Sequence, residues 1–133
     1  MTSQVKYLGN LRTSCKHLKS EDVFITDAPT DNNGLGEAFS PTDTIATGLA
    51  SCMFTIMGIK SKDLNIDLTD SVAHVKKVME ASPRRISEIH IAFELNISPS
   101  EKHKLILEKA AKTCPVMYSI HPDIKKDIIF NWK

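Results

Sequence analysis

Cys52 and Cys114 are the residues of this sequence whose type and position best suit covalent chemistry. Cys52 lies inside a long apolar run, and Cys114 opens the segment CPVMYSIHPDI near the C-terminus. Neither belongs to a CxxC pair, so their spacing is not that of a zinc knuckle or a thioredoxin-type loop. If the fold brings the two thiols together, they can cycle between dithiol and disulfide, and a thiolate becomes available as a nucleophile.

The local positions of the three cysteines predict different reactivities. Free cysteine is among the most buried residue types, so a position in a helix core is the simplest interpretation of Cys52. Cys52 also lies about three turns into its helix, away from the stabilising N-terminal dipole. Cys114 is expected at or near the N-cap of a short helix, whose N–H groups stabilise a thiolate. Local physics therefore favours Cys114 as the nucleophile, and Cys15, which no motif surrounds, is expected to be structural.

The hydrophobic pattern predicts an α+β protein with the element order βββ-α-ββ-αα-β, because strands are grouped apart from helices. A loop rich in Asp, Asn, Gly and Pro is expected over residues 27–39, and long ordered loops in small domains are often functional. One helix is expected after Ser98-Pro99-Ser100, and a short one begins at Cys114-Pro115. The expected strands are residues 3–8, 11–18, 22–26, 66–79, 86–97 and 127–132.

A central helix is predicted over residues 41–61. Ser40 as N-cap, Pro41 at the first helical position and Asp43 at the third give a clear start signal. Apolar residues lie on almost every side of this helix, so we expect it to be buried on every side. In a chain of this size, a wrapping sheet with other helices or a dimer partner must then cover it.

Size and composition indicate one globular domain over residues 1–133. The 17 basic and 16 acidic residues give a net charge of +1, so there is no electrostatic case for nucleic acid or membrane binding. The N-terminus has no apolar leader, and the run 45–59 is too short and too polar to span a bilayer, so a cytoplasmic location is expected. In a reducing compartment, an odd count of three cysteines favours reactive or buried thiols over structural disulfides. The histidine spacings fit no metal site.

Several segments resemble the OsmC/Ohr family (osmotically inducible protein C and organic hydroperoxide resistance protein). The stretch GEAFSPTD at residues 36–43, running on to ASC at 50–52, is similar to the family's central helix, and residues 114–116 resemble its second cysteine motif. Residues 7–12 (YLGNLR) and 26–29 (TDAP) resemble an OsmC-like subgroup. The resemblance spans almost the whole chain. It implies the OsmC-like fold, with a long buried central helix and an intertwined homodimer that has its sites at the subunit interface.

The same resemblance implies roles for three residues. The cysteine that matches Cys52 attacks the peroxide, and the one that matches Cys114 resolves the resulting sulfenate, which is the reverse of the order favoured by local physics. Arg12 matches, by order and rough spacing, an arginine that lies next to the reactive thiol. The implied protein is a thiol-dependent peroxidase that reduces organic hydroperoxides, with hydrogen peroxide as an alternative substrate, and ends in a Cys52–Cys114 disulfide. A small or protein dithiol is the implied reductant, and no metal or organic cofactor is expected.

One departure from the family bears on activity. In the hydroperoxide resistance branch, a glutamate directly after the helix-starting proline pairs with the arginine, whereas this chain has Thr42. Asp43 is a poor replacement, because nine residues at about 100° each place it on the opposite helix face from Cys52. Glu37, just ahead of the helix, reaches a similar place if the loop folds back. Two alternatives therefore stay open: a non-catalytic dimeric binding protein, and another activity of a cysteine nucleophile.

Overall fold

The computed structural model describes all residues from Met1 to Lys133. The chain divides into two compact units, Met1–Ile45 and Ala46–Lys133. Each unit contains a three-stranded sheet of its own. The predicted order βββ-α-ββ-αα-β is the observed one, with a short 3-10 helix, η1 (Thr30–Asn32), added in the loop after the third strand. The assignment of residues 1–133 to one domain stays a prediction.

The N-terminal unit is an antiparallel meander of β1 (Ser3–Gly9), β2 (Arg12–His17) and β3 (Val23–Asp27). All three strands lie within a residue or two of their predicted positions. The β1–β2 turn has positive φ at Gly9, Asn10 and Leu11, and this left-handed backbone closes the hairpin. The register pairs Arg12 at the start of β2 with Asp27 at the end of β3, so the third strand reaches one residue into the predicted loop.

The loop after β3 is held by backbone hydrogen bonds. The Asp27 N–H donates to the Phe39 carbonyl at 3.0 Å, and the Gly36 N–H donates to the Ala28 carbonyl at 3.1 Å. A Cβ atom at Gly34 would collide with the Ala28 carbonyl, so two parts of the backbone approach so closely here that only glycine fits. The segment is therefore a loop, as its composition predicted, and these hydrogen bonds hold it in place.

The long helix α1 (Pro41–Asp63) begins as the sequence predicts. Ser40 Oγ accepts a hydrogen bond from the Asp43 N–H at 3.1 Å, and Asp43 Oδ2 accepts one from the Ser40 N–H at 2.9 Å. These reciprocal bonds form a capping box that satisfies orphan donors at the helix start.

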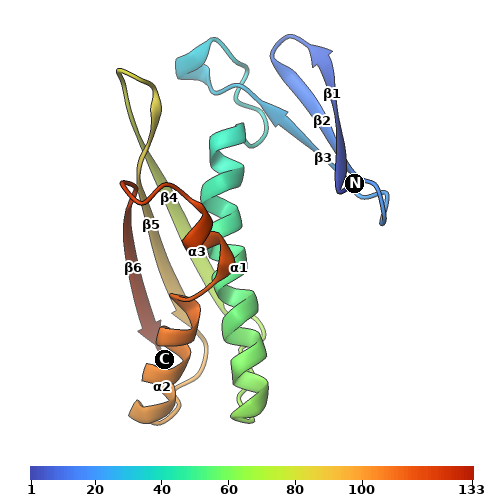
Figure 1. The fold of residues 1–133 in the computed structure, drawn as a ribbon. Coiled ribbons are helices and arrows are strands. Elements are labelled where there is room, and N and C mark those ends of the chain that lie inside the picture. Colours follow the sequence, from blue (N-terminus) through green and yellow to red (C-terminus); the bar gives the residue numbers. More distant parts are fainter. The chain divides into compact units, whose positions relative to one another are not determined.

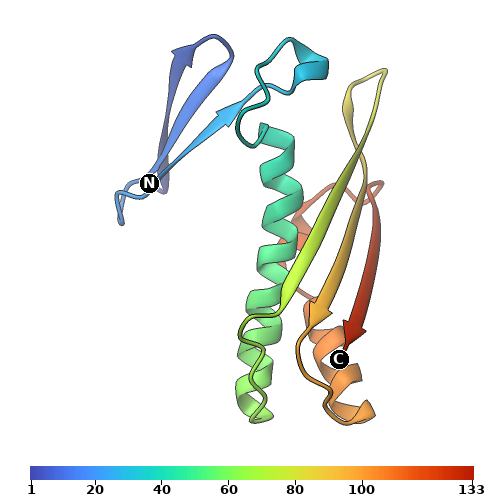
Figure 2. The ribbon, with the colours of Figure 1, turned by 180° about the vertical axis from the view of Figure 1, so that it is seen from behind.

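The C-terminal unit packs helices on one face of a sheet. The sheet consists of β4 (Val72–Glu80), β5 (Arg85–Leu95) and β6 (Lys125–Trp132), with β5 antiparallel to β4 and parallel to β6. The chain crosses from β5 to β6 through α2 (Glu101–Ala111) and α3 (Pro115–Ser119). Figure 1 shows α2 and α3 with α1 on one side of the sheet, and Figure 2 shows the strands from the other side.

The core of this unit lies between α1 and β5. The alternation predicted for β5 is confirmed, because Ile89, Ile91, Phe93 and Leu95 are buried against a core to which α1 contributes Leu49, Met53 and Met57. Phe93 forms an edge-to-face contact with Phe54, at 4.8 Å between ring centroids, and stacks on Phe130 at 5.2 Å. These contacts fix the central turns of α1 against the sheet.

Two predictions differ from the structure. Residues 66–71 form a loop with a turn at residues 69–70 rather than the start of β4, because Asp67 Oδ1 accepts a hydrogen bond from the Thr69 N–H at 2.9 Å and Asp70 has positive φ. Burial of α1 on every side is also wrong for the single chain, since Thr47, Ser51 and Thr55 are exposed along one side. By length and composition alone, α1 would be able to cross a membrane, but its apolar side forms the core described above.

Candidate active site

Cys114 is the N-cap residue of α3 and lies wholly inside the core. Its Sγ accepts a hydrogen bond from the Met117 N–H at 3.3 Å, as expected of a thiol at a helix start. Its relative exposure is 0%, and every residue of the surrounding cluster belongs to the C-terminal unit. The predicted capping position is therefore confirmed, in a much more apolar setting than the sequence indicated.

That apolar setting acts on the pKa of the Cys114 thiol. Burial raises the pKa of Cys114, because removal from water disfavours the thiolate. The helix-start N–H of Met117 acts in the opposite direction, but burial outweighs it. The sequence favoured Cys114 as the nucleophile because a helix start lowers the pKa of a thiol. Here the cap is present, but burial has the larger effect and the pKa is raised, so that argument loses its support.

Cys52 lies on the central part of α1, half-buried against the same core. Cys52 packs against the buried cluster that contains Cys114, and it is also among the groups that raise the pKa of Cys114. The fold thus brings together two thiols that are far apart in the sequence. One is partly accessible and the other is buried, and both are free thiols.

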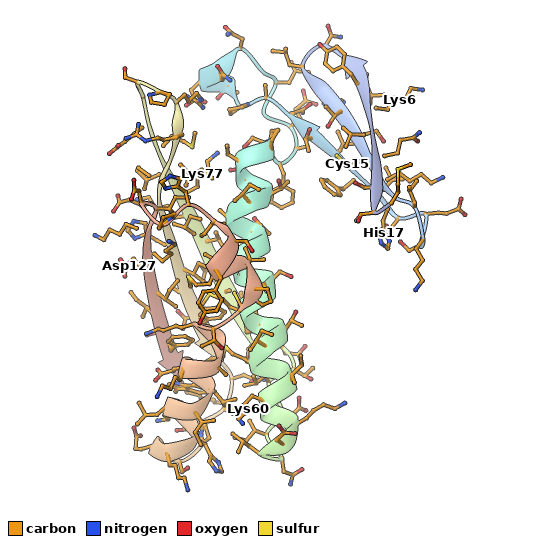
Figure 3. The ribbon with its side chains drawn as sticks, viewed as in Figure 1. Lys6, Cys15, His17, Lys60, Lys77 and Asp127 are labelled. Carbon is orange, nitrogen blue, oxygen red and sulfur yellow. The ribbon has the colours of Figure 1, made fainter.

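Cys15 lies elsewhere, on β2 of the N-terminal unit, where Figure 3 labels it. Its Sγ is 3.7 Å from Thr13 Oγ1, and the strand register places it between Val5 and Phe24. The structural or incidental role expected of Cys15 stays a prediction.

Arg12 also belongs to the N-terminal unit, where an aspartate holds its guanidinium. Arg12 Nε donates to Asp27 Oδ1 at 2.7 Å, and Nη2 donates to Asp27 Oδ2 at 2.9 Å, so the pair is bidentate. Asp27 is only 1% exposed, and its Oδ2 also accepts the Glu37 N–H at 3.1 Å. The hydrogen bond from Arg12 is the largest cause that holds the pKa of Asp27 below its ordinary value.

Asp27 was not predicted as the partner of Arg12, because its position was expected to lie in the loop after the third strand. The signal was the strand register: when 12–17 and 23–27 pair as neighbouring antiparallel strands, Arg12 stands directly opposite Asp27. Opposite charges at paired positions attract one another across a sheet. Aligning these two strands as an antiparallel hairpin would have predicted the Arg12–Asp27 pair.

The acidic residues that the sequence analysis proposed as partners of Arg12 have smaller roles. Glu37 Oε2 lies 3.5 Å from Arg12 Nη2, and its side chain is 66% exposed, so it is a secondary partner of the arginine. Asp43 completes the helix cap of Ser40, and Thr42 Oγ1 lies 3.1 Å from Ser40 Oγ. Asp27, rather than any residue of the segment 37–43, is therefore the main partner of Arg12.

Two neighbouring free thiols in an α+β protein, one partly accessible and one buried, are suited to thiol redox chemistry. The chain belongs to the OsmC-like protein family, whose sequence model matches residues 34–128. This confirms the resemblance that the two cysteine segments carried. No match was found among curated proteins.

Solved structures support the same assignment. A protein of Psychrobacter arcticus 273-4, described in connection with osmotic stress and detoxification, is 55% identical, with a TM-score of 0.96 over 98% of this chain and 96% of that one. An OsmC-like protein of Mycoplasma pneumoniae is 15% identical, with a TM-score of 0.80 over 98% of this chain and 94% of that one. An organic hydroperoxide resistance protein of Legionella pneumophila is 17% identical, with a TM-score of 0.72 over 98% and 97%. The last two share the fold, which confirms the predicted α+β OsmC-like architecture.

The Arg12–Asp27 pair predicts how stability depends on acid. Because the pKa of Asp27 is lowered in the folded chain, its contribution is present above the pKa of the unfolded chain and is lost as pH falls toward the folded-state pKa. Asp27→Asn should therefore lower the melting temperature by several degrees near neutral pH, and this deficit should shrink on the acid side. The matched control is Glu37→Gln, which alters the exposed partner of the same guanidinium and should change the melting temperature little. Equal melting curves for Asp27→Asn and the unmodified chain at neutral pH would contradict the account.

Proposed function

We propose that this protein is a thiol-dependent peroxidase that reduces organic hydroperoxides. The observation that carries the proposal is that the half-buried Cys52 lies near the buried Cys114. Membership of the OsmC-like family supports it, since neighbours of the same fold are named as organic hydroperoxide resistance proteins.

The proposed reaction balances without a metal or an organic cofactor. The Cys52 thiolate attacks one peroxide oxygen, the O–O bond breaks, and the alkoxide leaves and is protonated to an alcohol. Cys52 is then a sulfenic acid. The Cys114 sulfur attacks it, water leaves with the thiol proton, and a Cys52–Cys114 disulfide forms. A dithiol returns two electrons and two protons and restores both thiols.

Burial supports this division of roles. A peroxide must reach the attacking sulfur, and of the two thiols only Cys52 has exposed surface. Cys114 needs only to reach Cys52, and its raised pKa keeps it a protonated thiol until the sulfenic acid has formed. Apolar side chains near the two cysteines in sequence (Leu49, Met53, Ile56 and Met117) favour an organic hydroperoxide over hydrogen peroxide.

Arg12 is proposed as the cation that stabilises the Cys52 thiolate, a role carried over from the family. The bidentate bond to Asp27 fixes one edge of the guanidinium and holds its orientation. On this proposal, Asp27 supplies what the glutamate missing at Thr42 supplies in the hydroperoxide resistance branch.

Serine variants separate the roles of the two thiols. Cys52→Ser should abolish reduction of cumene hydroperoxide, because the attacking sulfur is gone. Cys114→Ser should permit one oxidation and block turnover, because the sulfenic acid has no thiol to condense with. The measurement is dimedone labelling, located by mass spectrometry after one equivalent of hydroperoxide. Labelling of Cys114 in Cys52→Ser, with none in Cys114→Ser, would reverse the roles.

Arg12→Ala should shift the pH midpoint of iodoacetamide alkylation at Cys52 upward by about one unit or more, as expected when a thiolate loses a nearby cation. The measurement uses chains with Cys15 and Cys114 replaced by Ser. Because Arg12→Ala alone leaves the buried Asp27 without its partner, the variant is also made with Asp27→Asn. Arg12→Lys should recover only part of the effect, since the bidentate fork is lost.

Arg85→Ala is the matched control for Arg12→Ala. Arg85 forms an exposed ion pair with Glu80 at 2.7 Å, in the C-terminal unit. Its loss should leave the alkylation midpoint at Cys52 unchanged. An unchanged midpoint in Arg12→Ala as well would make Arg12 an ordinary strand arginine.

A homodimer is proposed from the family resemblance and from the N-terminal sheet. Val23, Phe24 and Ile25 are successive residues of β3 that point to alternating faces of this sheet, and each is exposed. A three-stranded sheet needs a hydrophobic face packed on something in order to be stable. Sedimentation equilibrium at micromolar concentration should give twice the chain mass of 14.8 kDa. A monomeric mass would count against the intertwined dimer.

A further inference from the structure

We propose that the reducing thiol attacks the Cys52 sulfur of the Cys52–Cys114 disulfide, so that the reductant is joined covalently to Cys52 and never to Cys114. This inference rests on the proposed function, because it concerns the reduction half of the same cycle. It assigns the partner's point of attachment.

Access to the two sulfurs differs. Thiol–disulfide exchange requires the incoming thiolate to approach one sulfur from the side opposite the bond that breaks. Cys114 has 0% exposure and belongs to a buried cluster made only of residues of its own unit, with Leu107 and Ala111 of α2 among its members. Any further cover, from a second copy or a bound protein, can only add to this burial. No route to the Cys114 sulfur is therefore open in the folded unit.

Cys52 offers the other sulfur. It is half-buried on α1, and the neighbouring Ser51 and Thr55 are exposed on the same helix. A thiolate that reaches Cys52 breaks the disulfide and releases Cys114 as the leaving group.

A hydrogen bond to Cys114 Sγ favours Cys114 as the leaving group. The Met117 N–H, 3.3 Å from Cys114 Sγ, stabilises the negative charge that the departing sulfur carries before it takes up a proton. Burial works against departure, because it raises the pKa of Cys114 and a thiol of higher pKa leaves more slowly. The pKa of the leaving thiol only makes the exchange faster or slower, whereas a sulfur without exposed surface is not attacked at all. Access therefore determines which of the two sulfurs the reductant attacks.

The electron balance is that of a dithiol reductant. Its first thiolate forms an S–S bond with Cys52, the Cys52–Cys114 bond breaks, and Cys114 takes up a proton. Its second thiolate then attacks the reductant sulfur of the mixed disulfide and releases Cys52, which leaves the reductant as a disulfide. Two electrons and two protons pass to the protein.

The experiment maps the first mixed disulfide. In a Cys15→Ser chain, diamide forms the Cys52–Cys114 disulfide, and a brief treatment with glutathione is stopped with N-ethylmaleimide and acid. Trypsin places the two cysteines on separate peptides, residues 20–60 and 113–125. We expect glutathione on the Cys52 peptide and maleimide on the Cys114 peptide. Glutathione on the Cys114 peptide, in equal or greater amount, would overturn the proposal.

A second measurement does not depend on trapping the adduct. The Cys15→Ser background with Cys114→Ser, and the same background with Cys52→Ser, each retain one thiol of the pair. In the native state, DTNB should modify Cys52 at least about tenfold faster than Cys114, and the two rates should converge in denaturant. Equal native rates would show that Cys114 is accessible and would overturn the proposal.

Diamide keeps this test apart from the proposed function. A chain that ignores cumene hydroperoxide but places glutathione on Cys52 would refute the peroxidase and leave the attachment point standing. A chain that reacts with the hydroperoxide but places glutathione on Cys114 would do the reverse.

Discussion

Burial of the Cys114 thiol in the core of the C-terminal unit is the constraint on which the chemistry of this protein depends. The thiol caps α3 through the Met117 N–H, yet desolvation raises its pKa. Position at a helix start and removal from water act in opposite directions, and removal from water is the larger effect. In the proposed cycle, this burial leaves Cys114 to react with the neighbouring Cys52 sulfur, and the half-buried Cys52 is the thiol that a peroxide can reach.

The fold provides this asymmetry. The parallel β5–β6 pair requires a crossover, and α2 and α3 supply it, so the cap of α3 enters the core next to α1. Phe93, held between Phe54 and Phe130, fixes the α1 turn that follows Cys52. In the other unit, the β2–β3 register sets Arg12 against Asp27, and the ordered loop brings the Glu37 N–H onto the same carboxylate.

The sequence predicted those features that depend on local pattern. The alternation of β5, the capping signal at Ser40 and the Cys114-Pro115 helix start each follow from nearby residues, and each is confirmed. The features that depend on distant residues were harder to predict. The burial of Cys114 depends on a core assembled from several elements of its unit. The partner of Arg12 depends on strand register, and the exposed side of α1 depends on what the rest of the chain leaves uncovered. Residues 66–71 misled the strand prediction, because a local hydrogen bond between Asp67 and Thr69 competes with extended backbone.

Whether Cys52 and Cys114 form a redox pair can be tested by counting free thiols before and after stoichiometric cumene hydroperoxide, in the native chain with Cys15 replaced by Ser. Both remaining thiols should disappear together and return with a dithiol, because one peroxide yields one Cys52–Cys114 disulfide. Two thiols that persist after the hydroperoxide would contradict it and would favour a binding protein whose cysteines are core residues.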